Sequence, residues 1–182
     1  MIIKTSVTIQ GLLGTCRHVC RVLITKNLWH EVLVKSISTF FFIGYLPVAP
    51  GTFGSLAGVG LFYLLKEAGI NPFIVTSGLI ILGFLVAGKA EKLFAKKDPS
   101  FVVIDEVAGM LLSLLFLPAY DIKVIIIAFF YFRLLDIFKP FPAGRIEKMK
   151  GSLGLMGDDI VAAVYTNIIL QLVLRLTFFK TS

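Results

Sequence analysis

The chain is poor in charge, in cysteine and in histidine, and each shortage removes a class of protein. Only 16% of its 182 residues are charged, whereas 57% are hydrophobic. A soluble domain of this size needs more polar residues at its surface, and a disordered chain needs more charge, so neither class fits. Two cysteines, Cys16 and Cys20, are too few for a four-ligand zinc site or a disulfide scaffold. Length and composition therefore predict one membrane-associated domain.

The charge that is present is mostly basic. Eighteen Lys and Arg residues oppose 11 Asp and Glu residues, which gives a net charge of +7. No basic run alternates with exposed aromatic residues, so we expect no nucleic-acid partner, whereas basic residues beside apolar segments suit an anionic membrane surface. Residues 1–35 carry five basic residues and one acid. We interpret them as an N-terminal extension of unknown role, either an amphipathic segment on lipid or a poorly ordered tail.

From residue 36 onward, apolar runs alternate with short polar segments. The runs cover residues 37–46, 56–65, 73–88, 107–117, 122–138 and 160–179. They lack the alternation of a strand and are bounded by Gly, Pro and Asp, so helices are favoured. A membrane span needs about 20 residues, which only 160–179 and, with its flank, 73–94 provide. The sequence predicts an all-α, compact multi-helix bundle over residues 36–182, membrane-embedded or membrane-associated, with its polar site at one end.

The polar segments can be assigned to two ends of this bundle. If successive helices are antiparallel, segments 47–55, 89–105 and 139–159 meet at one end, and the turns near 67–72 and 118–122 lie at the other. The first end holds eight basic residues, and the second has little beyond Lys66 and Lys123. Because cytoplasmic loops of membrane proteins are enriched in Lys and Arg, we expect the first end to face the cytoplasm.

Five acids lie at the edges of apolar helices, all at this same end. They are Asp105, Glu106, Asp136, Asp158 and Asp159. A carboxylate beside hydrocarbon is costly unless it is paired or binds a cation, which favours a metal site. Helix capping is the alternative. Capping accounts for one acid at each helix start, but it leaves the two adjacent pairs and Asp136 unexplained.

Basic and hydroxyl residues near these acids could bind phosphate. Arg133, Asp136 and Lys139 are spaced three residues apart, so on a helix they share a face. They form either a plain ion-pair network or a phosphate site beside a metal-bound carboxylate. Residues 51–55, Gly-Thr-Phe-Gly-Ser, are predicted to be a loop that enters a helix and offers hydroxyl and N–H groups to an anion, although ordinary capping is an alternative. Residues 151–159 are predicted to be a flexible turn that carries Asp158 and Asp159 to the last helix.

If the substrate is a phosphate ester, several mechanisms are disfavoured. The two histidines, His18 and His30, are far in sequence from the acids, and the chain has neither a Cys-x5-Arg loop nor an Asp-x-Asp pair. What remains is hydrolysis assisted by a divalent metal on carboxylate ligands. Oxygen ligands without His or Cys favour Mg²⁺ over zinc.

Four segments resemble the motifs of the phosphatidylglycerophosphatase A family. They are GYLPVAPGTFGSLAG (44–58), VVIDEVAGM (102–110), FRLLDIFKPFP (132–142) and GSLGLMGDDIVAAVY (151–165). The resemblance covers about residues 40–170 and leaves the first 35 residues outside it. It implies a Mg²⁺-dependent, all-helical enzyme of the bacterial cytoplasmic (inner) membrane. Such an enzyme dephosphorylates the lipid phosphatidylglycerophosphate to phosphatidylglycerol in phospholipid biosynthesis.

Our site hypothesis combines the residue pattern with this resemblance. The expected metal ligands are Asp105, Glu106, Asp158 and Asp159. The residues expected to take part in catalysis are Asp105, Asp159 and Asp136, the last as a ligand or general base. The expected phosphate-binding residues are Arg133, Lys139, Thr52, Gly54 and Ser55. Two alternatives remain open: a phosphatase for another phosphomonoester, and a non-enzymatic membrane protein that binds or carries an anion. No oligomeric state follows from the sequence.

Overall fold

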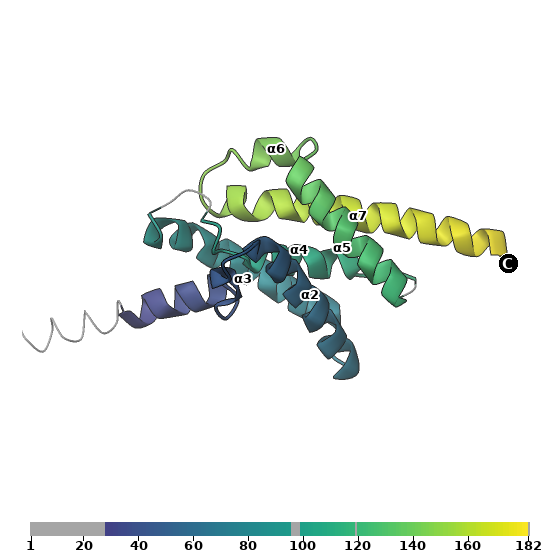
Figure 1. Ribbon diagram of the computed structural model, residues 1–182, viewed down its shortest axis with the longest axis horizontal. Helices are drawn as coiled ribbons and strands as arrows, with labels where there is room; N and C mark the ends of the chain where they lie inside the picture. Colours follow the sequence, from purple (N-terminus) through teal and green to yellow (C-terminus); the bar gives the residue numbers. More distant parts are fainter. Residues whose placement is uncertain (1–27, 96–98, 119, 182) are drawn as a thin grey trace, which may run out of the picture. The chain divides into compact units, whose positions relative to one another are not determined.

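The computed structural model describes residues 28–95, 99–118 and 120–181, with side chains as far as residue 176. Residues 28–38 are helical. They are followed by the 3-10 turn η1 (Ile43–Tyr45) and by α2 (Pro50–Glu67), α3 (Pro72–Leu93), α4 (Ile104–Leu114), α5 (Ile122–Phe138), α6 (Ala143–Ile146) and α7 (Ser152–Thr181). The described residues thus form helices and no strands, as predicted (Figure 1).

Contacts divide the chain into Met1–Val34 and Lys35–Ser182. The helices from α2 onward belong to the second unit. The expected extension over residues 1–35 lies mostly outside the described residues, so its role stays a prediction.

The short helix α4 forms the centre of the second unit. It packs against α2, α3, α5 and α7 (Figure 1). Nine of its eleven residues are buried, and Val107, Met110 and Leu111 are fully inaccessible to solvent. An 11-residue helix is about 16 Å long, too short to cross a bilayer. α4 is therefore a core helix that the longer helices surround.

Close packing of α2 on α4 depends on a line of small residues. Gly51, Gly54 and Gly58 are buried on one face of α2. A Cβ at Gly58 would lie 2.9 Å from the Val107 carbonyl oxygen, and one at Gly54 would lie 3.2 Å from that of Val103. A methyl group at either position would crowd α4, so these glycines let the two backbones approach closely and bring the start of α2 beside the start of α4.

Local sequence signals account for several helix ends. Asn71 caps α3 by accepting a hydrogen bond from the Phe73 N–H at 3.0 Å, and Pro72 occupies the first helical position. α5 ends at Phe138 because its C-cap, Lys139, has a left-handed φ of 47°, and the following Pro140 cannot continue a helix. The chain then reverses through α6 and reaches the N-terminus of α7.

Three predicted boundaries are wrong. The helix expected over 37–46 ends at residue 38, because Phe40, Phe41 and Phe42 all have positive φ and break it. The predicted loop at 47–55 and the predicted turn at 151–159 are largely helical, since α2 begins at Pro50 and α7 at Ser152. Glycines were interpreted there as loop residues, whereas they serve close packing: a Cβ at Gly154 would overlap the Met149 carbonyl oxygen.

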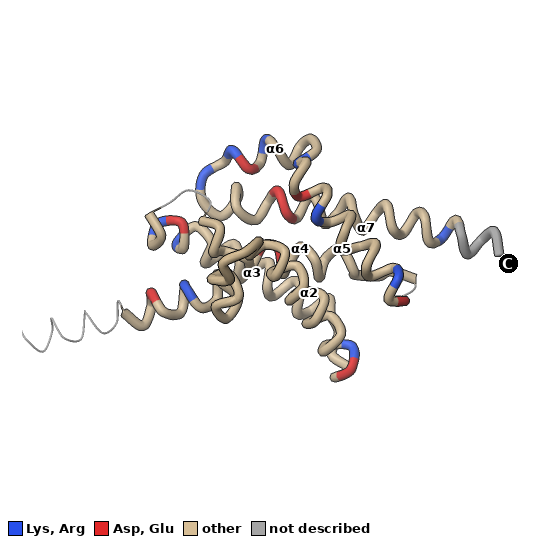
Figure 2. Tube along the Cα trace, viewed as in Figure 1, with Lys and Arg blue, Asp and Glu red and all other residues tan. Residues whose placement is uncertain are grey.

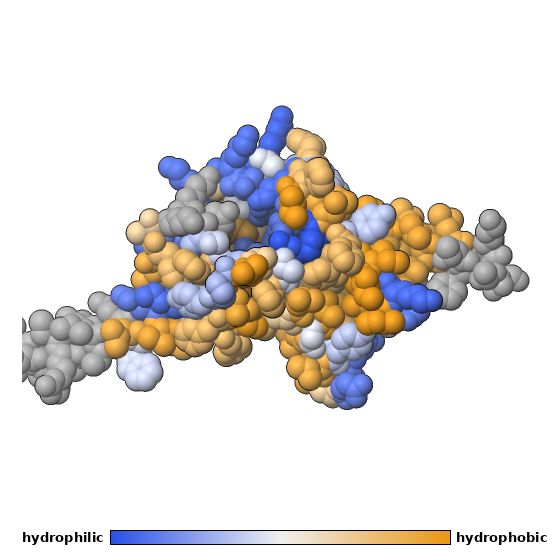
Figure 3. Space-filling view, viewed as in Figure 1, coloured by the Kyte–Doolittle hydropathy of each residue, from blue (hydrophilic) through white to orange (hydrophobic). Residues whose placement is uncertain are grey.

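Among the described residues, two helices are long and apolar enough to cross a membrane: Pro72–Leu93 and Ser152–Leu176. Both carry large exposed hydrophobic side chains, including Ile81 and Leu85 on α3 and Leu172 and Leu176 on α7. Apolar side chains also cover much of the face seen in Figure 3. Exposed apolar surface of this extent marks an interaction with lipid or with another protein.

Candidate active site

A cavity of about 90 Å³ lies where α3, α4, α5 and α7 approach one another. We call it the acidic cavity, because its lining includes Glu91, Asp105, Glu106, Asp136, Glu147, Asp158 and Asp159 but, among the described residues, only one cation, Lys139. Charged residues gather around α6 and the nearby parts of α5 and α7 (Figure 2). No histidine or cysteine of residues 28–95, 99–118 and 120–181 lines the cavity. All five acids singled out from the sequence therefore meet in one place.

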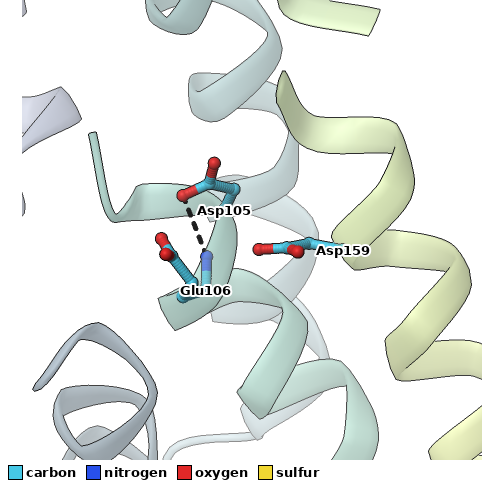
Figure 4. Close-up of side chains that lie close together, drawn as sticks. All are labelled: Asp105, Glu106 and Asp159. Carbon is cyan, nitrogen blue, oxygen red and sulfur yellow. Dashed lines mark hydrogen bonds between the residues drawn. The ribbon is translucent and has the colours of Figure 1, made fainter. Parts of the chain in front are cut away.

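Three of these acids form a tight cluster. One carboxylate oxygen from each of Asp105, Glu106 and Asp159 lies within 4.8 Å of the others. Asp105 and Glu106 belong to the first turn of α4, and Asp159 reaches them from the second turn of α7 (Figure 4). Two helices about 50 residues apart in sequence thus contribute to one group of oxygen atoms.

The position of Asp105 argues against simple helix capping. α4 begins at Ile104 after Val103, which makes no side-chain cap, and Asp105 lies inside the first turn. Its Oδ1 accepts a 3.0 Å hydrogen bond from the Glu106 N–H (Figure 4). Burial raises the pKa of Asp105 well above its ordinary value, and the neighbouring Glu106 carboxylate raises it further. Burial also raises the pKa of Glu106. Both acids thus gain from a nearby cation.

Two buried carboxylate oxygens have no hydrogen-bond partner among the described residues: Glu106 Oε2 and Asp158 Oδ1. Leaving a buried charged acceptor unsatisfied is costly. A divalent ion with ligands at about 2.0–2.1 Å requires its oxygens to lie no more than about 4.2 Å apart. The Asp105, Glu106 and Asp159 oxygens lie within 4.8 Å of one another and all are hard donors, so the donor set fits a hard metal ion.

Lys139 is fixed between two acids of different exposure. Its Nζ lies 2.7 Å from Asp158 Oδ2 and 2.9 Å from Glu147 Oε1. Burial lowers the pKa of Lys139, but its bonds to Asp158 and Glu147 raise it more, so the net shift is upward. The ammonium group is therefore charged and held at the edge of the acidic cavity.

Arg133 and Asp136 form a separate ion pair on α5. Arg133 Nη1 donates to Asp136 Oδ2 at 2.7 Å, one helical turn apart. Arg133 also lies beside the start of α2, where a Cβ at Gly51 would be 3.3 Å from its Nη1 and would overlap Glu106 Oε1. The predicted common face of Arg133, Asp136 and Lys139 is thus divided, since Lys139 follows the end of α5 and pairs with α7.

The predicted phosphate loop is arranged differently from the expectation. Thr52, Gly54 and Ser55 lie in the first two turns of α2 and do not line the acidic cavity. The Ser55 hydroxyl is buried and donates to the Gly51 carbonyl at 3.0 Å, and Gly54 packs on Val103. A phosphate-binding role for these three residues stays a prediction.

Glu91 and Glu147 line the cavity but were not singled out from the sequence. Glu91 lies in segment 89–105 and Glu147 in segment 139–159, and these two segments were expected to meet at the polar end. That expectation was the one sequence signal that could have placed both acids at the site. Neither adjoins a second acid, so they did not stand out as the two adjacent pairs did.

Comparisons with known proteins give a consistent result. The family model for phosphatidylglycerophosphatase A matches residues 36–174. A Bacteroides thetaiotaomicron protein, provisionally named a phosphatidylinositol-3-phosphatase, is 37% identical over 144 residues, which are 74% of this chain and 89% of the relative. Phosphatidylglycerophosphatase A of Haemophilus influenzae is 36% identical over 139 residues (75% and 85%), and that of Escherichia coli is 33% identical over 144 residues (76% and 79%). No solved structure matches the chain significantly.

Proposed function

The chain belongs to the phosphatidylglycerophosphatase A family, a family of phosphatases, and from this premise we propose that it hydrolyses phosphatidylglycerophosphate with the help of Mg²⁺. Water would add to the terminal phosphorus, the P–O bond to the headgroup glycerol would break, and phosphatidylglycerol and phosphate would leave. The observation that carries the proposal is the buried cluster of Asp105, Glu106 and Asp159.

Charge balance supports a metal-dependent reaction. Within the part of the chain that the structure describes, seven carboxylates and one ammonium group line the acidic cavity. A phosphate monoester carries up to two negative charges, and like charges repel strongly when they are partly shielded from water. The cavity therefore needs bound cations before it can accept phosphate.

Residues from α4 and α7 are the natural metal ligands. We assign this role to Asp105, Glu106, Asp158 and Asp159, whose donors are all hard oxygens suited to Mg²⁺. The two unpartnered oxygens, Glu106 Oε2 and Asp158 Oδ1, support the assignment. Bound Mg²⁺ would polarise the phosphoryl group and lower the pKa of attacking water.

The remaining charged residues have distinct parts in this proposal. A lysine ammonium has three N–H donors, and Lys139 uses two of them on Asp158 and Glu147, which leaves one for a phosphate oxygen. Arg133 keeps further donors beyond the one that binds Asp136. Asp136 is held through Oδ2, so Oδ1 can take the proton of the attacking water. That proton would pass on to the glycerol oxygen that leaves.

A second substrate is favoured by one specific observation. The Bacteroides thetaiotaomicron relative is named for phosphatidylinositol 3-phosphate hydrolysis and covers 74% of this chain. Phosphatidylinositol 3-phosphate and phosphatidylglycerophosphate share one arrangement: a phosphodiester next to the acyl chains and a phosphomonoester at the far side of the headgroup. The substrate class that we propose is a lipid of this arrangement, with phosphatidylglycerophosphate first.

We also propose that residues 36–182 form the phosphatase domain and that it works at the bacterial inner membrane with its acidic cavity facing the cytoplasm. The family match over residues 36–174 and the bacterial relatives support the domain and the membrane. Basic residues such as Arg145, Lys148 and Lys150 near the cavity support the orientation, because cytoplasmic segments are enriched in Lys and Arg.

Phosphate release by purified protein in neutral detergent micelles tests the proposal. The substrates are phosphatidylglycerophosphate, phosphatidylinositol 3-phosphate and the soluble ester glycerol 3-phosphate, each with Mg²⁺ or with EDTA. We expect the highest kcat/KM on phosphatidylglycerophosphate and no turnover in EDTA. Equal rates on glycerol 3-phosphate would contradict a lipid substrate, and full activity in EDTA would contradict the metal.

A further inference from the structure

A second cavity, of about 620 Å³, adjoins the acidic cavity at the start of α7. We call it the basic cavity, because its lining is Leu85, Gly88, Lys89, Glu91, Lys92, Lys150, Gly151 and Ser152. Glu91 and Gly151 line both cavities and therefore form the wall between them. No role in the proposed reaction uses its three lysines.

The three lysines are not neutralised within the described part of the chain. Lys89, Lys92 and Lys150 are exposed, and none forms an ion pair with a described residue. Ser152 Oγ accepts a 2.9 Å hydrogen bond from the Gly88 N–H, so its own proton is free to be donated. α7 begins at Ser152 and adds the positive end of its dipole. This lining has the chemistry of an anion site.

An apolar stripe leads away from the basic cavity along α3. Ile74, Ile81 and Leu85 are at least 58% exposed, and their spacing of seven and four residues places them on one face of the helix. Lys89 follows Leu85 by four residues and lies on the same face, and Leu85 itself lines the cavity. Along α3 the order is therefore apolar surface, Lys89 and then Glu91, which lines both cavities and is followed by Lys92.

We propose that the basic cavity binds the phosphodiester of a lipid substrate whose terminal phosphate lies in the acidic cavity. This inference rests on the proposed function and names the residues that would set its specificity: Lys89, Lys92, Lys150 and Ser152. The order from the apolar stripe through the basic cavity to the adjoining acidic cavity matches the order within the lipid, which runs from acyl chains through the phosphodiester to the phosphomonoester. A monoester without the phosphodiester would leave the three lysines without their anion.

Inhibition by a soluble phosphodiester tests this site apart from the membrane. The probe is glycerophosphoglycerol, a phosphodiester with no terminal phosphate and no acyl chains, and inorganic phosphate serves as the probe for the acidic cavity. Phosphate release from phosphatidylglycerophosphate in neutral detergent micelles is the readout, so surface charge of the carrier does not contribute.

Lys150→Gln and Lys148→Gln are a matched pair. Both lysines are exposed and two residues apart, but only Lys150 lines the basic cavity. We expect Lys150→Gln to raise the inhibition constant of glycerophosphoglycerol about fivefold and Lys89→Gln/Lys92→Gln/Lys150→Gln to raise it about 100-fold, as for charged contacts near a surface. In these variants the inhibition constant of inorganic phosphate should stay within about twofold, and Lys148→Gln should change neither.

Each outcome decides between the two proposals. Equal inhibition constants in Lys150→Gln and Lys148→Gln, or no inhibition of the wild type by glycerophosphoglycerol, overturn the phosphodiester site alone. If the lysine variants lost inhibition by inorganic phosphate to the same extent, the lysines would act on both cavities alike. That result would also overturn the phosphodiester site. No phosphate release by the wild type would contradict the proposed function, and the inference with it.

Discussion

The acidic and basic cavities share a wall but are built in different ways. The charges of the acidic cavity include those of Asp105 and Asp159, which are buried and belong to the packed helices α4 and α7. The basic cavity takes its charges from long, exposed lysines on α3 and before α7. In the first, helix packing positions the carboxylates; in the second, flexible side chains supply charge.

The two cavities differ in how precisely their charged groups must be placed. A bound ion and a reacting phosphate tolerate little displacement, and rigid neighbours keep their ligands in place. Recognition of a phosphodiester at a membrane surface mainly needs positively charged side chains that are near the anion and long enough to contact it. Substitutions should therefore act more strongly, and less additively, in the acidic cavity than in the basic one.

The largest effect is expected for Asp105→Asn. It removes a metal ligand but keeps the shape, so kcat should fall about 1,000-fold or more, which is about 4 kcal/mol of barrier. Stability should move the other way. Because burial raises the folded-state pKa of Asp105 above its unfolded value, the free energy of unfolding falls as pH rises through that range, and asparagine removes this cost.

Phosphate release with Mg²⁺ and thermal unfolding in EDTA, both at pH 7.5, check this prediction together. The melting temperature of Asp105→Asn should be equal to or above that of the wild type. A folded variant with wild-type activity would contradict the role of Asp105 in metal binding.

A smaller effect is expected for Gly51→Ala, which tests how far packing positions the cavity. The added methyl group would overlap Glu106 Oε1 and crowd Arg133, so kcat/KM should fall about 10- to 100-fold, as when groups that orient metal ligands are disturbed. The matched control is Gly60→Ala on the same helix, where nothing lies within 4 Å. It should leave activity unchanged and raise stability by about 0.5–1 kcal/mol. Equal activity in the two variants would contradict this account.

Metal affinity should depend on pH in a direction set by the acidic cavity. The pKa values of Asp105 and Glu106 are raised, so protons compete with Mg²⁺ at higher pH than for ordinary carboxylates. Affinity for Mg²⁺ should rise by up to about tenfold per pH unit for each proton released. Calorimetric titration between pH 5.5 and 8 measures this, and an affinity independent of pH would show that these carboxyl groups are not the ligands.

The smallest effect separates the two partners of Lys139. The Glu147 side chain is 41% exposed and that of Asp158 is 9% exposed. Glu147→Gln should therefore change kcat/KM less than about threefold, since exposed ion pairs contribute little. Asp158→Asn should cost far more, because it removes a proposed ligand as well as the Lys139 pair. Equal losses of kcat/KM in Glu147→Gln and Asp158→Asn would contradict the expectation that the buried partner of Lys139 matters more than the exposed one.

Much of this arrangement could be predicted from the sequence. Apolar runs without alternation predicted helices, and acids beside them predicted that Asp105, Glu106, Asp136, Asp158 and Asp159 lie together, as the acidic cavity shows. Acids are so costly in apolar surroundings that their positions alone are informative. The family resemblance was confirmed by the match over residues 36–174.

Other features could not be predicted, because they depend on contacts between distant segments. Glycines at 51, 54 and 154 are typical of loops, but packing on α4 and on the segment after α6 keeps them helical. The pairing of Lys139 with Asp158, 19 residues away, depends on the left-handed backbone that ends α5. Glu91 lines the acidic cavity because of where α3 packs, and no local sequence pattern specifies that packing.

The most direct test of the central claim is a Mg²⁺ titration of phosphate release from phosphatidylglycerophosphate by protein stripped with EDTA. The wild type should be inactive without metal and should recover fully as Mg²⁺ saturates the site. Asp159→Asn, which removes the contribution of α7 to the cluster, should recover less than about 1% of that activity at any Mg²⁺ concentration. Full activity of the stripped wild type, or full recovery of folded Asp159→Asn, would contradict a metal centre shared by α4 and α7.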